Sequence, residues 1–159
     1  MQTIEAIEGP LDDKIFPPMV SVINMMPDDA EIKDLSYPEI RSKLEARDML
    51  FGVRHNLGFP HSLGVIVALA GAMIEHGGKT VRVTEIAANT RAHDEATHEL
   101  MDAVVTQARE QGADELVLDM TPQQGTTAAE FVERFQFSPS EHGAYVLKLA
   151  DVDMDELRG

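Results

Sequence analysis

The residues from Thr90 to Leu100, TRAHDEATHEL, lie between a predicted strand and a predicted helix. A turn at such a junction often receives a phosphate, because the helix N-terminus offers N–H groups and a partial positive charge. Such turns usually carry glycine, which lets the backbone approach the ligand, and this one carries none. It holds Arg91, together with Asp94 and Glu95. The residue types fit an anion-binding turn, the remnant of one, or an ordinary helix start.

The charges at this turn favour the remnant. Arg91 can bind a phosphate through two donors, or it can pair as an exposed arginine with Glu95, four residues later. Asp94 and Glu95 favour the empty helix start through the helix dipole. At about 6 Å and an effective dielectric near 20, each carboxylate would cost a bound phosphate roughly 3 kcal/mol before screening.

No metal site is predicted. The chain has no cysteine, which excludes disulfides and thiolate ligands. His93 and His98 are five residues apart on one predicted helix, a poor spacing for two ligands on the same face.

Composition predicts one globular domain over residues 1–150 and an acidic tail over residues 151–159. The 159 residues are 43% hydrophobic and 26% charged. The 28 acidic and 13 basic side chains give a net charge of −15, which argues against nucleic-acid binding and disfavours anionic ligands unless positive charge is focused locally.

The sequence predicts neither membrane insertion nor secretion. The N-terminus has no basic region followed by an apolar run, and the apolar stretch Leu63–Ile74 is too short for a membrane span of about 20 residues. We therefore expect a cytoplasmic protein.

Hydrophobic periodicity predicts the elements that must position these residues. Strands are expected at residues 2–9, 49–56, 64–75, 80–88, 115–120 and 143–150, and helices at residues 12–26, 36–48, 91–111 and 126–135. The turn HGGK at His76–Lys79 makes the three central strands an antiparallel meander. In the strand at residues 80–88, alternation places Glu85 on the face of Val81 and Val83. The long helix then crosses from the strand at residues 80–88 to the strand at residues 115–120. These two strands must therefore run parallel to each other.

Two stretches carry a wider pattern. After the apolar strand end at Ile86, residues Arg91, Asp94 and Ala96 occupy the spacing Q/R-x-x-G-x-G/A, and GTTAAEFVERFQF at Gly125–Phe137 occupies the spacing N-x-x-A-x-x-x-Y-x-x-x-G-F. Together with the order of elements, this resembles the GNAT acetyltransferase superfamily over nearly the whole chain.

The resemblance implies an α/β (α+β) fold and a cofactor. The fold is a mixed, mostly antiparallel sheet of six or seven strands with about four helices and a splay between its two parallel central strands. The cofactor is acetyl-CoA, whose pyrophosphate the turn would bind through backbone N–H groups. The residues implied at this site are Ile86, Ala87, Ala88, Arg91, Ala92, His93, Asp94, Glu95 and Ala96.

The departures from the family pattern fall where the chemistry is done. Asp94 replaces the first glycine, and Val132 stands where the family often has a tyrosine that protonates the departing thiolate. Gln136 replaces a glycine, whereas the packing positions Ala128 and Phe137 match. The chain therefore resembles a degenerate member, whose binding of acetyl-CoA should be weak.

Acyl transfer to an amine needs a base, and Glu85, beside the implied splay, is the first candidate. Its alternative is an ordinary surface or groove glutamate. His55 and His61 are lower-ranked bases. Tyr145, on the last strand, could supply the missing acid or could simply pack in the core.

Two functions remain open. The first is an acetyl-CoA-dependent N-acetyltransferase acting on a small-molecule amine or on a protein lysine or N-terminus; an acidic protein suits a basic acceptor. The second is a non-catalytic protein that keeps the fold as a structural or binding module, such as a phage virion or assembly component. No nucleic acid or membrane partner is expected, and a homodimer or an assembly partner is compatible with either.

Overall fold

A computed structural model describes residues 2–55, 65–89 and 92–152. The strands are β1 (Gln2–Ala6), β2 (Met49–His55), β3 (Val65–Glu75), β4 (Thr80–Ala88), β5 (Glu115–Leu118), β6 (Ser138–Pro139) and β7 (Tyr145–Lys148). The helices are α1 (Phe16–Ile23), α2 (Tyr37–Glu45), α3 (Asp94–Glu110) and α4 (Thr127–Phe135).

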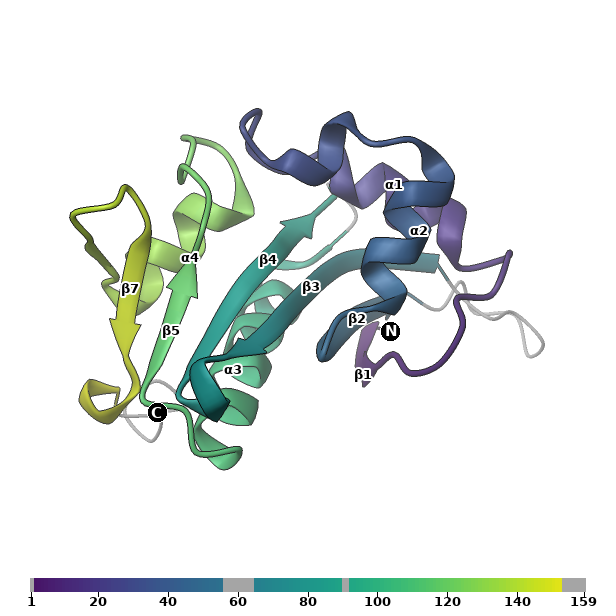
Figure 1. The fold of residues 1–159 in the computed structure, drawn as a ribbon. Coiled ribbons are helices and arrows are strands. Elements are labelled where there is room, and N and C mark those ends of the chain that lie inside the picture. Colours follow the sequence, from purple (N-terminus) through teal and green to yellow (C-terminus); the bar gives the residue numbers. More distant parts are fainter. Residues whose placement is uncertain (1, 56–64, 90–91, 153–159) are drawn as a thin grey trace.

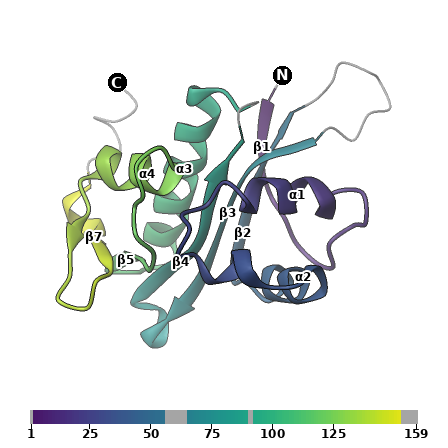
Figure 2. The same cartoon turned by 90° about the horizontal axis from the view of Figure 1, so that it is seen from above.

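The strands form one seven-stranded sheet in the order β1-β2-β3-β4-β5-β7-β6 (Figure 1). Helices α1 and α2 cover one face, and α3 and α4 cover the other (Figure 2). All pairs are antiparallel except β4 and β5, which are parallel because α3 crosses between them. The predicted fold class and the predicted parallel pair are confirmed. The short strand β6 was not predicted, and α3 begins three residues later than expected.

The helix starts follow from local sequence. Pro17 lies in the first turn of α1, where its missing N–H costs nothing. Before α2, the Ser36 hydroxyl and N–H donate to Glu39 Oε1 at 2.7 and 3.3 Å. These bonds lower the pKa of the Glu39 carboxyl. Thr126 caps α4 by accepting the Ala129 N–H.

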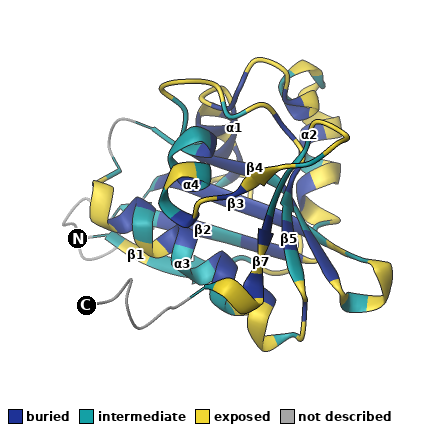
Figure 3. Cartoon of the chain, turned by 90° about the vertical axis from the view of Figure 1, so that its left-hand side faces the viewer, coloured by how far each residue is buried: buried dark blue, intermediate teal, exposed yellow. Residues whose placement is uncertain are grey.

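The core lies on both faces of the central strands, which are dark blue in Figure 3. The helix α3 buries the apolar face that its four-residue periodicity predicts, formed by Ala96, Leu100, Met101, Val104, Val105 and Ala108. On the opposite face of the sheet, α1 buries Met19, Val22 and Ile23. Among the described methionines up to β2, Met19, Met26 and Met49 are buried in the core, whereas Met25 is 47% exposed.

One extra residue interrupts β4. Val83 lies opposite Ala72, but Glu85 lies opposite Gly71, so Thr84 is a β-bulge. Since neighbouring residues of β3 face opposite sides of the sheet, Val83 and Glu85 do too. The predicted alternation, which put Glu85 on the face of Val83, is therefore wrong: the bulge turns Glu85 to the face of Arg82.

The same strand parts from β5 after the bulge. Only Thr80–Val83 pair with β5, opposite Glu115–Leu118, whereas Thr84–Ala88 continue beside β3 alone. We call the resulting gap, between Thr84–Ala88 on one side and Asp119 and Met120 on the other, the β4/β5 opening. It is the predicted splay between the parallel strands.

The C-terminus of α4 provides a test of the local fold. Gln136 ends this helix with φ 58° and ψ 51°, a left-handed conformation that glycine adopts without strain. We expect Gln136→Gly to raise the free energy of unfolding by about 1 kcal/mol in urea denaturation. The control is Ala46→Gly at the end of α2, where φ is −89° and glycine should lower stability. Equal losses of unfolding free energy in both variants would contradict the left-handed conformation of Gln136.

Candidate active site

The edge of β4 at the opening carries backbone groups that point away from β3. The Asn89 N–H donates to Val67 O at 2.9 Å, which makes this pair a hydrogen-bonded one. Because such pairs alternate along an antiparallel ladder, Ala87 and Glu85 also bond to β3. Ile86 and Ala88 therefore direct their N–H and C=O groups into the β4/β5 opening, where an extended amide-bearing ligand could pair with them.

The N-terminus of α3 follows directly. His93 is its N-cap in an extended conformation, and within the described residues no side-chain hydrogen bond caps the helix. The first-turn N–H groups of Asp94, Glu95 and Ala96 are therefore available to an anion. The His93 N–H itself donates to Gln2 Oε1 at 3.1 Å.

The structure places most of the predicted cofactor residues on these two features. Ile86, Ala87 and Ala96 are buried, Ala88 and Ala92 are half-buried, and His93, Asp94 and Glu95 are exposed. Arg91 lies outside the described residues. That these residues bind acetyl-CoA stays a prediction.

A cavity of about 160 Å³ lies beside the opening, on the face covered by α2. Its charged lining residues are Glu31, Lys43, Arg47, Arg82, Glu85 and Asp119, and its apolar ones include Ile32, Leu35 and Met120. Three carboxylates thus face three cations in a small space, which suits a polar ligand with an amine.

Glu85 is the most constrained of these groups. Arg47, which follows α2, donates from Nε to Glu85 Oε1 at 2.8 Å and from Nη2 to Oε2 at 2.7 Å. The Thr84 hydroxyl donates to Oε1 at 2.6 Å. The Glu85 side chain is 1% exposed and that of Arg47 11%. Since Oε1 already accepts two bonds, only Oε2 has a lone pair left for an acceptor amine.

Gly71 makes room for this carboxylate. A Cβ atom on Gly71 would overlap Glu85 Oε1 and lie 3.4 Å from Arg47 Cγ. The glycine on β3, the bulge on β4 and the arginine after α2 therefore form one arrangement around Glu85.

The other predicted catalytic side chains lie apart from the cavity. Tyr145 lies opposite Leu118 at the end of β5, so it is near the same end of the sheet but on the far side of β5 from Glu85. His55 lies at the end of β2 and contacts Gln2. His61 is outside the described residues. The role of Tyr145 as an acid stays a prediction.

The exposed carboxylates of the cavity, Asp119 and Glu31, were not predicted from the sequence. Asp119 directly follows β5, and Glu31 lies in a short 3₁₀ helix between α1 and α2. The only signal for Asp119 was a polar residue at the end of an apolar strand, in ELVLDM. Glu31 had none, because its position depends on how the α1–α2 segment crosses the sheet.

The described part of the chain has neither a membrane-spanning helix nor a cluster of metal ligands. Within residues 2–55, 65–89 and 92–152, no helix is long and apolar enough to cross a membrane. In the same part of the chain, no group of three or more histidine or carboxylate side chains could hold a metal ion.

Comparison with solved structures matches this fold to acetyltransferases. An acetyltransferase of the GNAT family from Staphylococcus aureus Mu50 superposes with a TM-score of 0.67 at 14% identity, covering 92% of this chain and 99% of that one. The ribosomal-protein-S18-alanine N-acetyltransferase from Escherichia coli gives 0.63 at 15% identity, covering 96% and 97%. The N-acetylglutamate synthase from Neisseria gonorrhoeae, complexed with coenzyme A and N-acetyl-glutamate, gives 0.66 at 15% identity, covering 94% of this chain and 35% of that one.

These likenesses establish the fold. The chain has the fold of the GNAT acetyltransferases, as the resemblance of its sequence implied. No protein-family model matches the chain, and no curated protein sequence does.

The Arg47–Glu85 pair provides a stability test. Glu85→Gln leaves the nearly buried Arg47 guanidinium facing a neutral amide, so we expect the free energy of unfolding to fall by roughly 3 kcal/mol. Glu75→Gln is the matched control, because it removes the same charge from a half-buried, more solvent-accessible pair with Arg82 and should cost less than about 1 kcal/mol. Chemical denaturation of both variants decides. Similar losses in the two would show that Glu85 is not a structural anchor.

Proposed function

We propose that the protein is an acyl-CoA-dependent N-acyltransferase that transfers an acetyl group to an amine. The observation that carries this proposal is the β4/β5 opening. One edge of it presents the free backbone groups of Ile86 and Ala88, the uncapped N-terminus of α3 follows that edge, and a carboxylate-lined cavity adjoins it.

The binding roles follow from these groups. Ile86 and Ala88 would pair with the amides of an extended pantetheine arm, as one strand pairs with another. The N–H groups of Asp94, Glu95 and Ala96 would hold the pyrophosphate. When bound, acetyl-CoA would supply a thioester carbonyl at the cavity.

The acceptor amine would enter the cavity and lose a proton there. We propose Asp119 as the base, because it lines the cavity and is exposed there. Glu85, the candidate from sequence, would touch the amine through Oε2 and orient it. The acceptor would be a small-molecule amine or a protein amine.

Departure of the thiolate calls for a proton donor. Val132, on α4, is half-buried against the core and cannot donate a proton. Tyr145 is the proposed acid, and Tyr145→Phe should then lower turnover by about tenfold or more. In Tyr145→Phe the thiolate would depart unassisted, which is why its turnover should be slow.

A non-catalytic module is the second candidate. It is favoured by the exposed carboxylates of Asp94 and Glu95 at the place where the pyrophosphate would lie, and by the Arg47 side chain that already occupies Glu85. If neither the wild type nor the variants Asp94→Asn and Glu95→Gln bind acetyl-CoA, the protein is a non-catalytic module.

Cofactor binding should be limited by repulsion at α3. We expect Asp94→Asn and Glu95→Gln each to tighten acetyl-CoA binding about fivefold in calorimetry, since each removes one like charge. Glu110→Gln, at the other end of α3, is the control and should change nothing. The wild type should also bind more tightly when salt is raised, because salt screens the repulsion. If the wild type binds acetyl-CoA with low-micromolar affinity and neither substitution changes that affinity, Asp94 and Glu95 do not weaken binding at α3.

Assays of activity and stability should distinguish the roles of two of the three cavity carboxylates, Asp119 and Glu85. Asp119→Asn should lower kcat by about 10²–10⁴ with little change in stability, as expected for a lost base. Glu85→Gln should mainly lower stability. A large loss of kcat in Glu85→Gln at a temperature where it stays folded, with full activity in Asp119→Asn, would reverse the assignment.

A further inference from the structure

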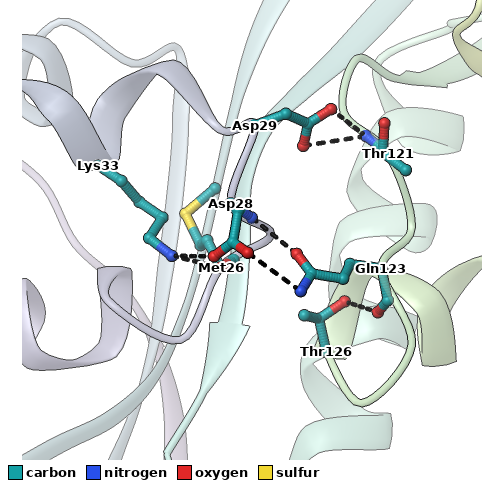
Figure 4. A network of polar contacts seen from close by, with 7 residues as sticks. All are labelled: Met26, Asp28, Asp29, Lys33, Thr121, Gln123 and Thr126. Carbon is teal, nitrogen blue, oxygen red and sulfur yellow. Dashed lines mark hydrogen bonds and ion pairs between the residues drawn. The ribbon is translucent and has the colours of Figure 1, made fainter.

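A set of polar contacts, which we call the clasp, joins the segment between α1 and α2 to the loop between β5 and α4 (Figure 4). The Asp28 N–H donates to Gln123 Oε1 at 2.8 Å, and Gln123 Nε2 donates to Asp28 Oδ2 at 3.3 Å. The Thr121 N–H donates to Asp29 Oδ2 at 3.0 Å. These contacts join residues 92 to 95 positions apart in the sequence.

Both halves of the clasp are anchored. Lys33 Nζ donates to Met26 O at 3.0 Å and to Asp28 Oδ1 at 3.2 Å, which fixes the α1–α2 half. Thr126, the N-cap of α4, donates its hydroxyl to Gln123 O at 2.5 Å, which fixes the other half. The clasp therefore connects two supported segments.

The clasp lies at the rim of the acceptor cavity. Ala30 and Glu31, directly after Asp29, line one wall, while Asp119 and Met120, directly before Thr121, line another. In Figure 1 the α1–α2 segment reaches towards the β5–α4 loop above the diverging ends of β4 and β5. The clasp thus joins these two walls at the rim of the cavity.

We infer that the clasp restricts the acceptor to a small free amine and excludes an amine carried on a peptide or protein chain. The inference rests on the proposed acyl transfer and narrows its substrate. A cavity of about 160 Å³ is smaller than the pockets of about 300–1,000 Å³ that hold drug-sized ligands. A polymer would also need a path past the rim, where Asp29 and Gln123 hold the walls together.

The first experiment compares acceptors of the same chemistry. Free L-lysine and a ten-residue peptide with one internal lysine are each assayed with acetyl-CoA. We expect the wild type to favour free lysine by at least 100-fold in kcat/KM. The double variant Asp29→Ala, Gln123→Ala should narrow that ratio at least tenfold by raising the rate with the peptide.

Two single variants are the controls. Asp29→Asn removes the charge but keeps an oxygen that accepts the Thr121 N–H, so it should behave as the wild type. Asp34→Ala removes a charge from the same exposed segment, and no contact of its side chain is found in the described part of the chain. It should also leave the ratio unchanged.

Amide hydrogen exchange at Thr121 gives a readout that needs no activity. Exchange should be slow in the wild type and in Asp29→Asn, and at least tenfold faster in Asp29→Ala. Equal exchange in the wild type and Asp29→Ala would overturn the inference, as would wild-type acetylation of the peptide at the rate of free lysine; either result leaves acyl transfer itself intact. No transfer to any amine by any variant would instead overturn the proposed function, and the inference with it.

Discussion

The extra residue at Thr84 determines which face of the sheet Glu85 lies on, and it marks where the sheet opens. It turns Glu85 to the face covered by α2, where Arg47 binds the carboxylate with two hydrogen bonds, and it coincides with the point where β5 leaves β4. Without a bulge, alternation would direct Glu85 to the opposite face, away from the arginine. Gly71 on the neighbouring strand is part of the same constraint, since no side chain fits beside this carboxylate. A buried ion pair thus holds the strand at the place where the sheet opens.

Much of the fold could be predicted because apolar spacing dictates it. The four-residue repeat from Ala96 to Ala108 specifies which face of α3 is buried, and the helix crossover dictates that β4 and β5 are parallel. At Gln136 the family pattern has a glycine, and the backbone at this position is left-handed, the conformation that favours glycine. The bulge could not be predicted, because a one-residue shift in pairing leaves no mark in the composition of a single strand.

The candidate site was only partly visible in the sequence for the same reason. The predicted cofactor residues between Ile86 and Ala96 adjoin one another along the chain, so a local pattern could indicate them, and their role stays a prediction. The cavity depends on long-range contacts, since Glu31, Arg47 and Asp119 come from three separate segments. Its electrostatics are mixed: helix dipole and free N–H groups favour an anion at α3, while Asp94 and Glu95 oppose it. Under the proposed function, this conflict would weaken cofactor binding although the fold is complete.

The central claim is that the edge of β4 at the opening is a binding surface for the extended arm of acetyl-CoA. Titration with acetyl-CoA followed by backbone amide chemical shifts in NMR tests it residue by residue. The amides of Ile86 and Ala88, which point into the opening, should shift most within β4, together with those of Asp94 to Ala96, whereas the Ala87 amide, bonded to β3, should shift little. Saturating acetyl-CoA that leaves Ile86 and Ala88 unchanged, or that shifts amides only elsewhere in the chain, would contradict the account.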